Sequence, residues 1–555
     1  MRLSSQLPPC SATRRASDST KPVRSLPMTV MTSGTCMSAV LTRRAELTSD
    51  SGAVRETQLP RPLRTAKLRA MRTSFRPLQR AGFGLAALAI ILSGCQTSQR
   101  TSGAAGDVFS QVSTNVYFTP VNQLLTPAGL QIELPGLRPQ ALALSPDEKI
   151  FVTAGKTHEL VVLDPRTGKI LQQVPLPSDK DTDPAPPDVN APILQPDKEG
   201  QVSYTGLVFS PDGERIYLSN VRGSIKVFGV EANGKVIGLF SISLPPATAP
   251  SRKIEIPAGL AVSRDGKRLY VALNLSNKLA ELDTNDGRVL RIWDVGVAPF
   301  DVALVGNKIY VSNWGGRQPD AQSVTGPAGR GVKVRVDPVR YIANEGSVSV
   351  VDLKSEIVTG LHASALAVSP NQRWLAVANA GSDTLSVIDT RADKIVETIW
   401  TRQSPADLFG AQPNALAFDQ SGKKLFVCNG SQNAVAVVDF NPGKSELCGL
   451  IPVGWFPGAI ATTHHKQRTT LLVANIKGLG SNKSLNPERN KGSSSLQYRG
   501  GISVLVAPGE KELPQLTQIA LANMRHGLLQ EAKLPARAGQ PARPVPERVG
   551  EPSVF

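Results

Sequence analysis

Short apolar runs alternate with small polar segments over most of the chain, and residues 365–400 show this pattern clearly. Apolar positions gather at 365–368, 374–378, 385–388 and 395–400, and turn-forming residues such as Asn, Asp, Gly and Ser separate them. Runs of this length between turns predict short β-strands. We therefore expect a four-stranded antiparallel sheet in about 40 residues, with a hydrophobic face that one sheet cannot bury alone.

Six further segments repeat this arrangement, so the chain carries seven copies. They span residues 141–164, 207–229, 260–283, 302–352, 415–439 and 469–507. A strand repeat with a period of about 40 residues is typical of a β-propeller, whose blades bury their faces against one another. The sequence thus predicts an all-β, seven-bladed β-propeller of four-stranded antiparallel blades. An extra strand at 131–134 is expected to complete the last blade and close the ring.

The segments outside the repeats differ from them in composition. A Ser/Thr/Arg/Pro-rich start and a Pro/Arg-rich end show no strand periodicity, and a short helical segment precedes that end. The predicted boundaries are 1–70 for a leader that is disordered or precedes the true start of translation, 71–95 for a signal peptide, 96–119 for a flexible tether, 120–510 for the propeller, 511–530 for the helical segment and 531–555 for a linker or tail.

The net charge of +17 does not indicate a nucleic-acid-binding protein, because most of it lies in residues 1–80. We expect no nucleic-acid partner and a monomer. The five cysteines have no metal-ligand spacing. Cys428 and Cys448 are expected on the second and fourth strands of one blade, with a strand between them, so no disulfide is predicted.

Residues 71–95 have the layout of an export signal: three arginines, an apolar run at 83–92, and Ser93-Gly94 before Cys95. The run is too short for a permanent membrane helix. The segment from Leu92 to Cys95 resembles the bacterial lipoprotein signal motif. That resemblance implies lipid attachment to Cys95 and a location on the periplasmic face of the cell envelope, at the outer membrane if the cell is Gram-negative.

Two long Gly-rich insertions follow the second strand of their blades, at 313–344 and 478–499. Loops at equivalent positions should emerge on the same face of the ring, and loops on a rigid scaffold often carry binding residues. Trp314 with Arg317 could form a contact pair for a partner; packing of Trp314 over a blade edge is the alternative. The binding candidates are Asn313, Trp314, Gly315, Gly316, Arg317, Lys477, Asn482, Lys483, Arg489, Tyr498 and Arg499.

Signals for catalysis are weak. The pair His464-His465 has no second His or carboxylate at ligand spacing. Aspartates recur after the third strand of several copies, where a carboxylate can cap a turn through backbone N–H groups. These are Asp164, Asp283, Asp352, Asp389 and Asp439. We therefore predict no catalytic residues, no metal, no cofactor and no enzymatic activity for this chain.

The repeats resemble the YVTN family of bacterial β-propellers, with RIYLSN, RLYVALN and WLAVAN as second strands and SVSVVD, TLSVID and AVAVVD as third strands. TPAGLQIEL, SNWGGR, VGWFPGAI, ANIKGLGS and ELPQLTQIALANMRH narrow the resemblance to bacterial proteins that join such a propeller to an alkaline-phosphatase-superfamily phosphoesterase. Residues 120–530 carry it. The phosphoesterase half, with its nucleophile and metal ligands, has no counterpart here.

Two main hypotheses follow. The first is an envelope-anchored, non-catalytic binding module, whose insertion face docks a phosphoesterase or another envelope protein, with membrane attachment through lipid on Cys95. The alternative is a propeller hydrolase or lactonase-like enzyme with a site in the central channel, where converging His, Glu or Arg would be expected. A redox accessory protein is a third hypothesis. It is weaker than the other two, because the sequence lacks the Cys and His spacings that would bind a redox centre.

Overall fold

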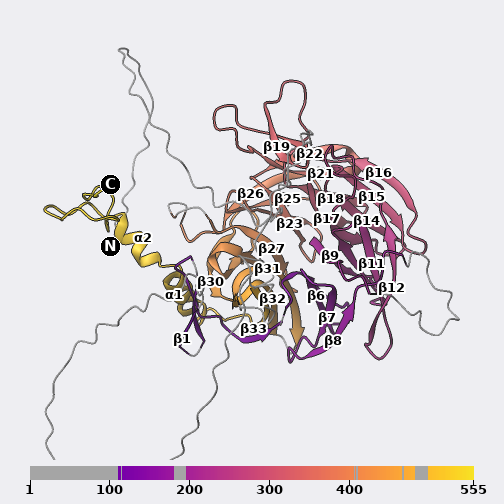
Figure 1. Ribbon diagram of the computed structural model, residues 1–555, viewed down its shortest axis with the longest axis horizontal. Helices are drawn as coiled ribbons and strands as arrows, with labels where there is room; N and C mark the ends of the chain where they lie inside the picture. Colours follow the sequence, from indigo (N-terminus) through magenta and orange to yellow (C-terminus); the bar gives the residue numbers. More distant parts are fainter. Residues whose placement is uncertain are drawn as a thin grey trace, which may run out of the picture. The chain divides into compact units, whose positions relative to one another are not determined.

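The structure is a computed structural model, and it describes residues 110–113, 115–119, 121–134, 136–180, 196–404, 407, 410–465, 468–481 and 498–555. These residues form seven four-stranded antiparallel sheets arranged as the blades of a propeller (Figure 1). The predicted fold class, an all-β seven-bladed propeller with a short helical C-terminal segment, is confirmed. Residues 1–109, with Cys95, lie outside the described part of the chain.

The first three blades use consecutive strands. They are β5 (Pro139–Leu144), β6 (Phe151–Gly155), β7 (Glu159–Leu163) and β8 (Ile170–Pro175); β9 (Val202–Phe209), β10 (Arg215–Asn220), β11 (Ser224–Val230) and β12 (Val236–Ser243); and β13 (Pro257–Val262), β14 (Arg268–Leu273), β15 (Lys278–Asp283) and β16 (Val289–Asp294).

The remaining blades follow in chain order, except that the last blade takes its outer strand, β4, from before the first blade. They are β17 (Pro299–Val305), β18 (Lys308–Asn313), β21 (Gly346–Val350) and β22 (Ser355–Thr359); β23 (Ala363–Val368), β24 (Trp374–Asn379), β25 (Thr384–Asp389) and β26 (Lys394–Trp400); β27 (Pro413–Phe418), β28 (Lys424–Asn429), β29 (Ala434–Asp439) and β30 (Glu446–Pro452); and β31 (Trp455–His465), β32 (Arg468–Ser481), β33 (Tyr498–Val506) and β4 (Leu130–Glu133).

The ring closes through β4, which supplies the outer strand of the last blade. Ile132 pairs with Ile502 of β33, and the side-chain amide oxygen of Gln131 accepts a hydrogen bond from the Ser503 hydroxyl at 2.7 Å. The expected closing strand at 131–134 is thus confirmed, one residue earlier. Innermost strands of successive blades contact one another around the ring, including β31 with β5.

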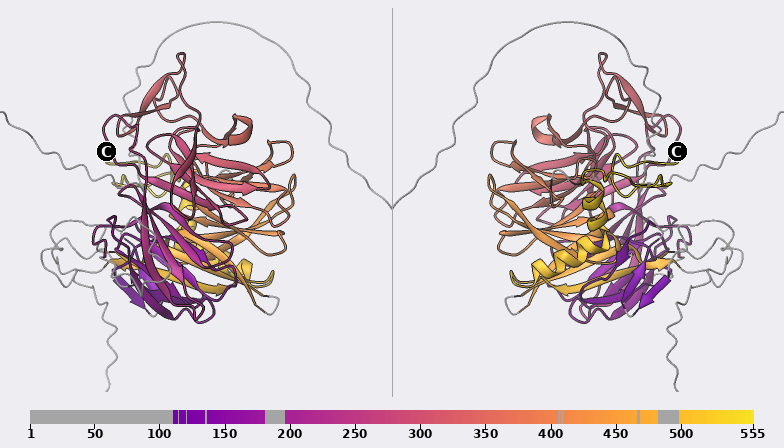
Figure 2. Two further views of the ribbon diagram at one scale, coloured as in Figure 1. Left: turned by 90° about the vertical axis from the view of Figure 1, so that its right-hand side faces the viewer. Right: turned by 90° about the vertical axis from the view of Figure 1, so that its left-hand side faces the viewer.

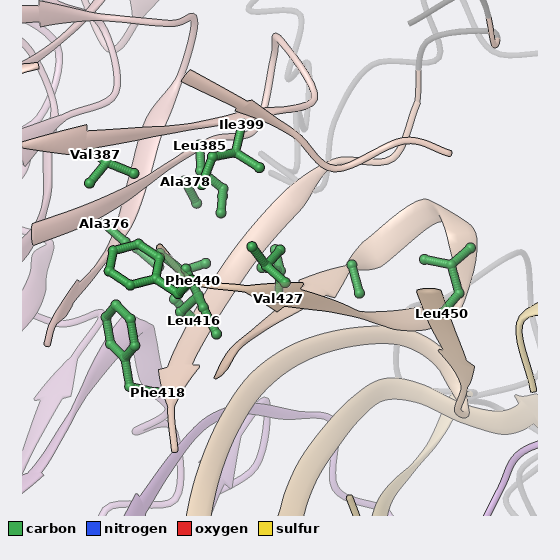
Figure 3. Packing of buried hydrophobic residues seen from close by; sticks show 14 of the residues in the cluster. Ala376, Ala378, Leu385, Val387, Ile399, Leu416, Phe418, Val427, Phe440 and Leu450 are labelled. Atoms are coloured by element: carbon green, nitrogen blue, oxygen red, sulfur yellow. The ribbon is translucent and has the colours of Figure 1, made fainter. Parts of the chain in front are cut away.

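Apolar side chains fill the spaces between blades, because the central strands of a blade are buried on both faces. Between blades five and six, Leu385 and Val387 meet Leu416 and neighbouring side chains (Figure 3). Phe418 packs edge-on against Phe440 with 4.9 Å between ring centroids. Each blade therefore buries its faces only when the neighbouring blades are present.

Aspartates in the turns after the third strands accept hydrogen bonds from the backbone, as the sequence predicts. Asp164, Asp283 and Asp389 each accept a hydrogen bond from the backbone N–H two residues further on, at 2.7, 3.0 and 2.9 Å. The predicted capping role is confirmed at these three turns. Cys428 on β28 is buried and Cys448 on β30 is exposed, and both are free thiols, which agrees with the predicted absence of a bridge.

Smaller elements surround the blades. A sheet of β1 (Ser110–Ser113), β2 (Val116–Phe118) and β3 (Leu124–Leu125) precedes the ring, and a hairpin of β19 (Thr325–Gly329) and β20 (Val332–Arg335) lies within the blade-four insertion. Short 3-10 turns occupy Val351–Leu353 and Gly430–Gln432. Helix α1 (Leu513–Asn523) packs on β30 and is followed by α2 (His526–Ala532). Neither helix of the described chain has the length and apolar character of a membrane span.

Candidate functional site

The innermost strands surround the axis of the ring (Figure 1). Each of the seven carries a β-bulge or irregularity near its start. Propellers place a central channel along this axis, and bulges often lie beside functional sites. Side chains that interrupt the repeat near the start of an innermost strand are therefore candidate functional groups.

Asp301 interrupts the repeat at one such position. On β17 it faces Ser312 of β18, one step before Val302 faces Val311. The other six blades place only glycine or alanine at the equivalent step. These residues are Ala141, Gly206, Gly259, Ala365, Ala415 and Ala459. A single carboxyl group thus replaces a small side chain at a step where Ala141, Ala365, Ala415 and Ala459 pack between neighbouring blades.

Both oxygens of the Asp301 carboxyl accept backbone hydrogen bonds. Oδ1 accepts the N–H of Val302 at 2.9 Å, and Oδ2 accepts the N–H of Leu366 on the next blade at 3.0 Å. A Cβ atom on Gly259 would lie 2.6 Å from Oδ1, so the glycine makes room for the carboxyl. The group is therefore fixed where blades three, four and five meet.

Burial raises the pKa of Asp301 to about 7, and the two backbone N–H groups oppose this rise. The side chain keeps a partial exposure to solvent, but the surrounding protein is dense enough to disfavour the charged form. Each carboxylate oxygen can accept more than one hydrogen bond, so both retain accepting capacity. A carboxyl with these properties suits a general base at neutral pH.

Two aromatic side chains from different blades pack together beside Asp301. Tyr204 of blade two lies 5.5 Å from Phe300 of blade four, centroid to centroid, and the hydroxyl of Thr205 donates to the Phe300 carbonyl at 3.5 Å. Blades two and four approach across blade three because Ala258 and Gly259 are small. Burial raises the pKa of Tyr204 to about 12, so its phenol stays protonated at neutral pH.

A depression of about 510 Å³ opens at the other ends of the innermost strands. Residues of blades five and six line most of it, including Leu366, Val368 and Phe418, and Glu148 and His464 add polar groups. The depression is shallow and open to solvent. Leu366 connects this depression to Asp301, because its backbone N–H binds the carboxyl.

His464 and Glu148 form a polar pair at this mouth. The Nε2 atom of His464 accepts the backbone N–H of Gln420 at 2.9 Å, so Nδ1 carries the ring proton and faces Glu148 Oε1 at 3.9 Å. Glu148 Oε2 accepts hydrogen bonds from the Thr463 hydroxyl at 2.6 Å and from the backbone N–H of His464 at 2.9 Å. His464 therefore has a carboxylate neighbour from blade one, although no such group lies near it in sequence.

The predicted binding residues of the blade-four insertion are engaged within the fold. Asn313 is buried and donates to the hydroxyl groups of Ser347 and Ser349 at 3.0 and 2.9 Å. Trp314 stacks on His362 with centroids 3.7 Å apart, and burial lowers the pKa of His362 to about 4. Gly315 and Gly316 are buried.

Arg317 does not pair with Trp314. Its guanidinium binds Glu345 at the base of the same insertion, with Nε and Nη2 at 3.0 and 2.7 Å from the two carboxylate oxygens. The structure thus brings Trp314 against a neighbouring blade and Arg317 against its own insertion. Docking of a partner on these residues stays a prediction.

The candidates in the last blade are only partly described. Lys477 lies over the rings of Trp455 and Phe456, at 4.7 and 5.4 Å from the centroids, and Arg499 is paired with Glu133 at 3.3 Å. Tyr498 begins β33. Asn482, Lys483 and Arg489 lie outside the described residues.

Asp301 and Glu148 are not among the residues predicted from the sequence. The signal for Asp301 is present in the sequence, because PFDVALV aligned with PAGLAV, ASALAV and PNALAF shows one carboxylate among small residues, one position before the repeat copy at 302–352. Glu148 was not detectable, since only ring closure brings the first blade beside the last. The described residues contain no group of three or more His, Cys, Asp or Glu side chains that could hold a metal ion.

A family model for "Lactonase, 7-bladed beta-propeller" matches residues 334–450. The match runs from the blade-four insertion through blade six, well under half of the 555 residues. It supports a propeller family and leaves the narrower resemblance to YVTN propellers and to their phosphoesterase partners as a prediction. No curated protein matches the chain.

Several solved structures are similar in fold. Hydrazine synthase of Kuenenia stuttgartiensis shares 16% identity at a TM-score of 0.45, over 67% of this chain and 96% of that one. The RRP9 WD40 repeats and U3-55K each share 13% identity at a TM-score of 0.46, over 68% of this chain and 97% and 98% of theirs. At these scores the likenesses carry no argument about function.

The family-model match corrects one prediction. The sequence predicts no enzymatic activity, whereas similarity to a lactonase propeller over 334–450 points to a hydrolase. The prediction of a chain without enzymatic activity is therefore wrong. That prediction rests on the absence of closely spaced His and Cys motifs. A propeller channel can instead bring together single residues from separate blades, which leave no such motif in the sequence.

Proposed function

We propose that this protein is a hydrolase that cleaves an ester or lactone bond at the central channel, with Asp301 as the general base. One observation carries the proposal: a lone carboxyl with a pKa of about 7 stands on an innermost strand, at a step where the other six blades have glycine or alanine. The similarity to a lactonase model over 334–450 supports the same reaction class.

The chemistry needs one proton acceptor beside a bound water. A carboxylate oxygen of Asp301 takes a proton from the water as the water oxygen attacks the carbonyl carbon. The C–O bond of the ester or lactone then breaks, and the leaving oxygen takes the proton back. The two backbone N–H groups hold the carboxyl in place during this exchange.

The depression at the channel mouth supplies binding. Its apolar wall, with Leu366, Val368 and Phe418, suits an aliphatic part of the substrate. His464 and Glu148 offer a polar contact at the rim. We assign these two residues to substrate binding, because the Nε2 lone pair of His464 is already used by Gln420.

Hydrolysis of a panel of chromogenic esters and aliphatic lactones tests the proposal. Asp301→Asn should lower kcat by about 10² to 10⁴-fold, whereas His464→Gln should raise KM by about 5-fold with little change in kcat. Asp164→Asn is the matched control, because it alters a turn carboxylate that only caps backbone N–H groups. Wild-type rates in a folded Asp301→Asn protein would rule out the assigned base.

The location and partners are further proposals that rest on sequence. We propose that lipid on Cys95 anchors the propeller to the cell envelope, and that the insertion face docks an envelope protein such as a phosphoesterase. Residues 71–95 and the two Gly-rich insertions support this. A mass for the membrane-extracted protein without lipid on Cys95 would contradict the anchor.

A further inference from the structure

A six-residue turn at 337–342 in the blade-four insertion exposes three large apolar side chains. Val339 is 84% exposed, Tyr341 69% and Ile342 52%. Scattered single apolar residues on a surface are ordinary, but three on one short turn mark an interaction site.

The turn is held in one shape by its own hydrogen bonds. The Asp337 carboxylate accepts the N–H groups of Val339 and Arg340 at 2.9 and 2.7 Å, and its carbonyl accepts the Tyr341 N–H at 2.8 Å. The Asp337 N–H donates to the Ile342 carbonyl at 2.9 Å. The apolar side chains are therefore presented outward on a fixed backbone.

The insertion does not need these side chains for its own core. Val334 and Val336 are buried against Val297 of the ring, and Gly331 packs on Pro250. The insertion projects beyond the blades, as both views in Figure 2 show. Val339, Tyr341 and Ile342 thus lie outside the buried cluster of the insertion.

Exposed positive charge lies on the turn and on the hairpin before it. Residues 317–345 carry five basic and three acidic residues, and the acidic groups are already engaged. Asp320 and Glu345 bind Arg335 and Arg317, and Asp337 binds its own turn. Three exposed cations form no ion pair within the described residues. They are Arg330, Lys333 and Arg340.

We propose that the exposed surface of the insertion docks on an anionic lipid surface, with the apolar turn (Val339, Tyr341, Ile342) and Arg340 at one end of β20 and Arg330 and Lys333 at its other end. Aliphatic side chains on the turn enter the boundary between headgroups and acyl chains, and a tyrosine suits that interface. The basic residues are attracted to lipid phosphates and anionic headgroups. This contact is independent of the proposed hydrolase activity.

Binding of the full chain to lipid vesicles tests the proposal, with Cys95→Ser present so that no attached lipid contributes. The protein should bind vesicles of mixed phosphatidylglycerol and phosphatidylcholine, and bind pure phosphatidylcholine weakly. Replacing Val339, Tyr341 and Ile342 by Ser should weaken binding at least ~10-fold. Replacing Arg330, Lys333 and Arg340 by Gln should weaken it by about 100-fold and remove its salt dependence.

Two controls separate this site from general stickiness. Val545→Ser with Val549→Ser removes apolar groups that are 82% and 79% exposed in the C-terminal tail, and should leave binding unchanged. In a Tyr341→Trp variant, vesicles should shift the emission of the added indole to the blue. Equal binding by the Ser variant, no binding to anionic vesicles, or loss of binding only in the tail variant would overturn the proposal, as would capture of an acidic protein in place of lipid.

Discussion

Burial and hydrogen bonding have opposite effects on the pKa of Asp301. Dense protein around the carboxyl disfavours its charge, while the N–H groups of Val302 and Leu366 favour it, and burial prevails. Such a group stores an unfavourable charge in the folded protein at neutral pH, which is a common property of catalytic carboxyls. The same balance makes the stability of the protein depend on pH.

The first prediction concerns that dependence. Because the pKa of Asp301 is about 7 in the folded chain and near 3.8 when unfolded, the native state binds the extra proton between these values. Asp301 therefore stabilises the fold at low pH, and this contribution is lost as the pH rises through 7. Between pH 5 and pH 8 the titration of Asp301 should lower the free energy of unfolding by about 3 kcal/mol.

Urea unfolding of the wild type and of Asp301→Asn at pH 5 and pH 8 measures this contribution. The amide cannot titrate, so the variant should lack that share of the pH dependence, while all other titrating groups remain common to both proteins. The same loss of stability in both proteins between the two pH values would contradict a raised pKa for Asp301.

Residues whose role depends on one sequence neighbourhood could be predicted, and residues whose role depends on distant partners could not. The turn aspartates Asp164 and Asp389 follow from their position after a strand. Glu148 meets His464 only because the ring closes. Trp314 was expected either to face a partner or to pack on a blade, and its stack on His362 required the start of blade five to be placed.

At the scale of elements, apolar periodicity was sufficient for the blades. Strands β23 to β26 begin and end within two residues of the predicted runs. The hairpin of β19 and β20 was missed, because glycine and proline in TGPAGRG hide the alternation of Val332, Val334 and Val336. Those valines form a hairpin because Val297 and neighbouring groups of the ring cover them.

The second prediction concerns β4, which joins the two ends of the ring. The Leu134 N–H donates to the Gly500 carbonyl at 2.9 Å, and the N–H of Ile132 lies on the same edge because alternate residues of a strand share an edge. Ile132→Pro should remove a hydrogen bond between β4 and β33 and destabilise the fold by about 3 kcal/mol or more.

Glu133→Pro is the matched control, since the N–H of Glu133 points away from β33 and its side chain is exposed. Guanidinium unfolding monitored by far-UV circular dichroism should show a clear loss of stability for the first variant and a small one for the second. Equal effects of the two prolines would show that β4 does not hold the ring closed.

At the scale of the whole molecule, the ring unites groups from separate blades. Its fold was predictable because one repeat determines all seven blades, and each blade needs its neighbours to bury its faces. Its activity was not, because Asp301, Leu366, His464 and Glu148 come from four different blades and share no motif. The chemistry of this propeller is expected to depend on departures from the repeat and not on the repeat itself.

The pH dependence of kcat/KM for a hydrolysed ester or lactone tests the central claim most directly. A general base must be ionised, so the rate should rise about tenfold per pH unit below pH 7 and level off above it, with an apparent pKa of about 7 that the Asp301→Asn enzyme lacks. A flat profile between pH 5 and pH 9, or the same profile in Asp301→Asn, would contradict a catalytic carboxyl at this position.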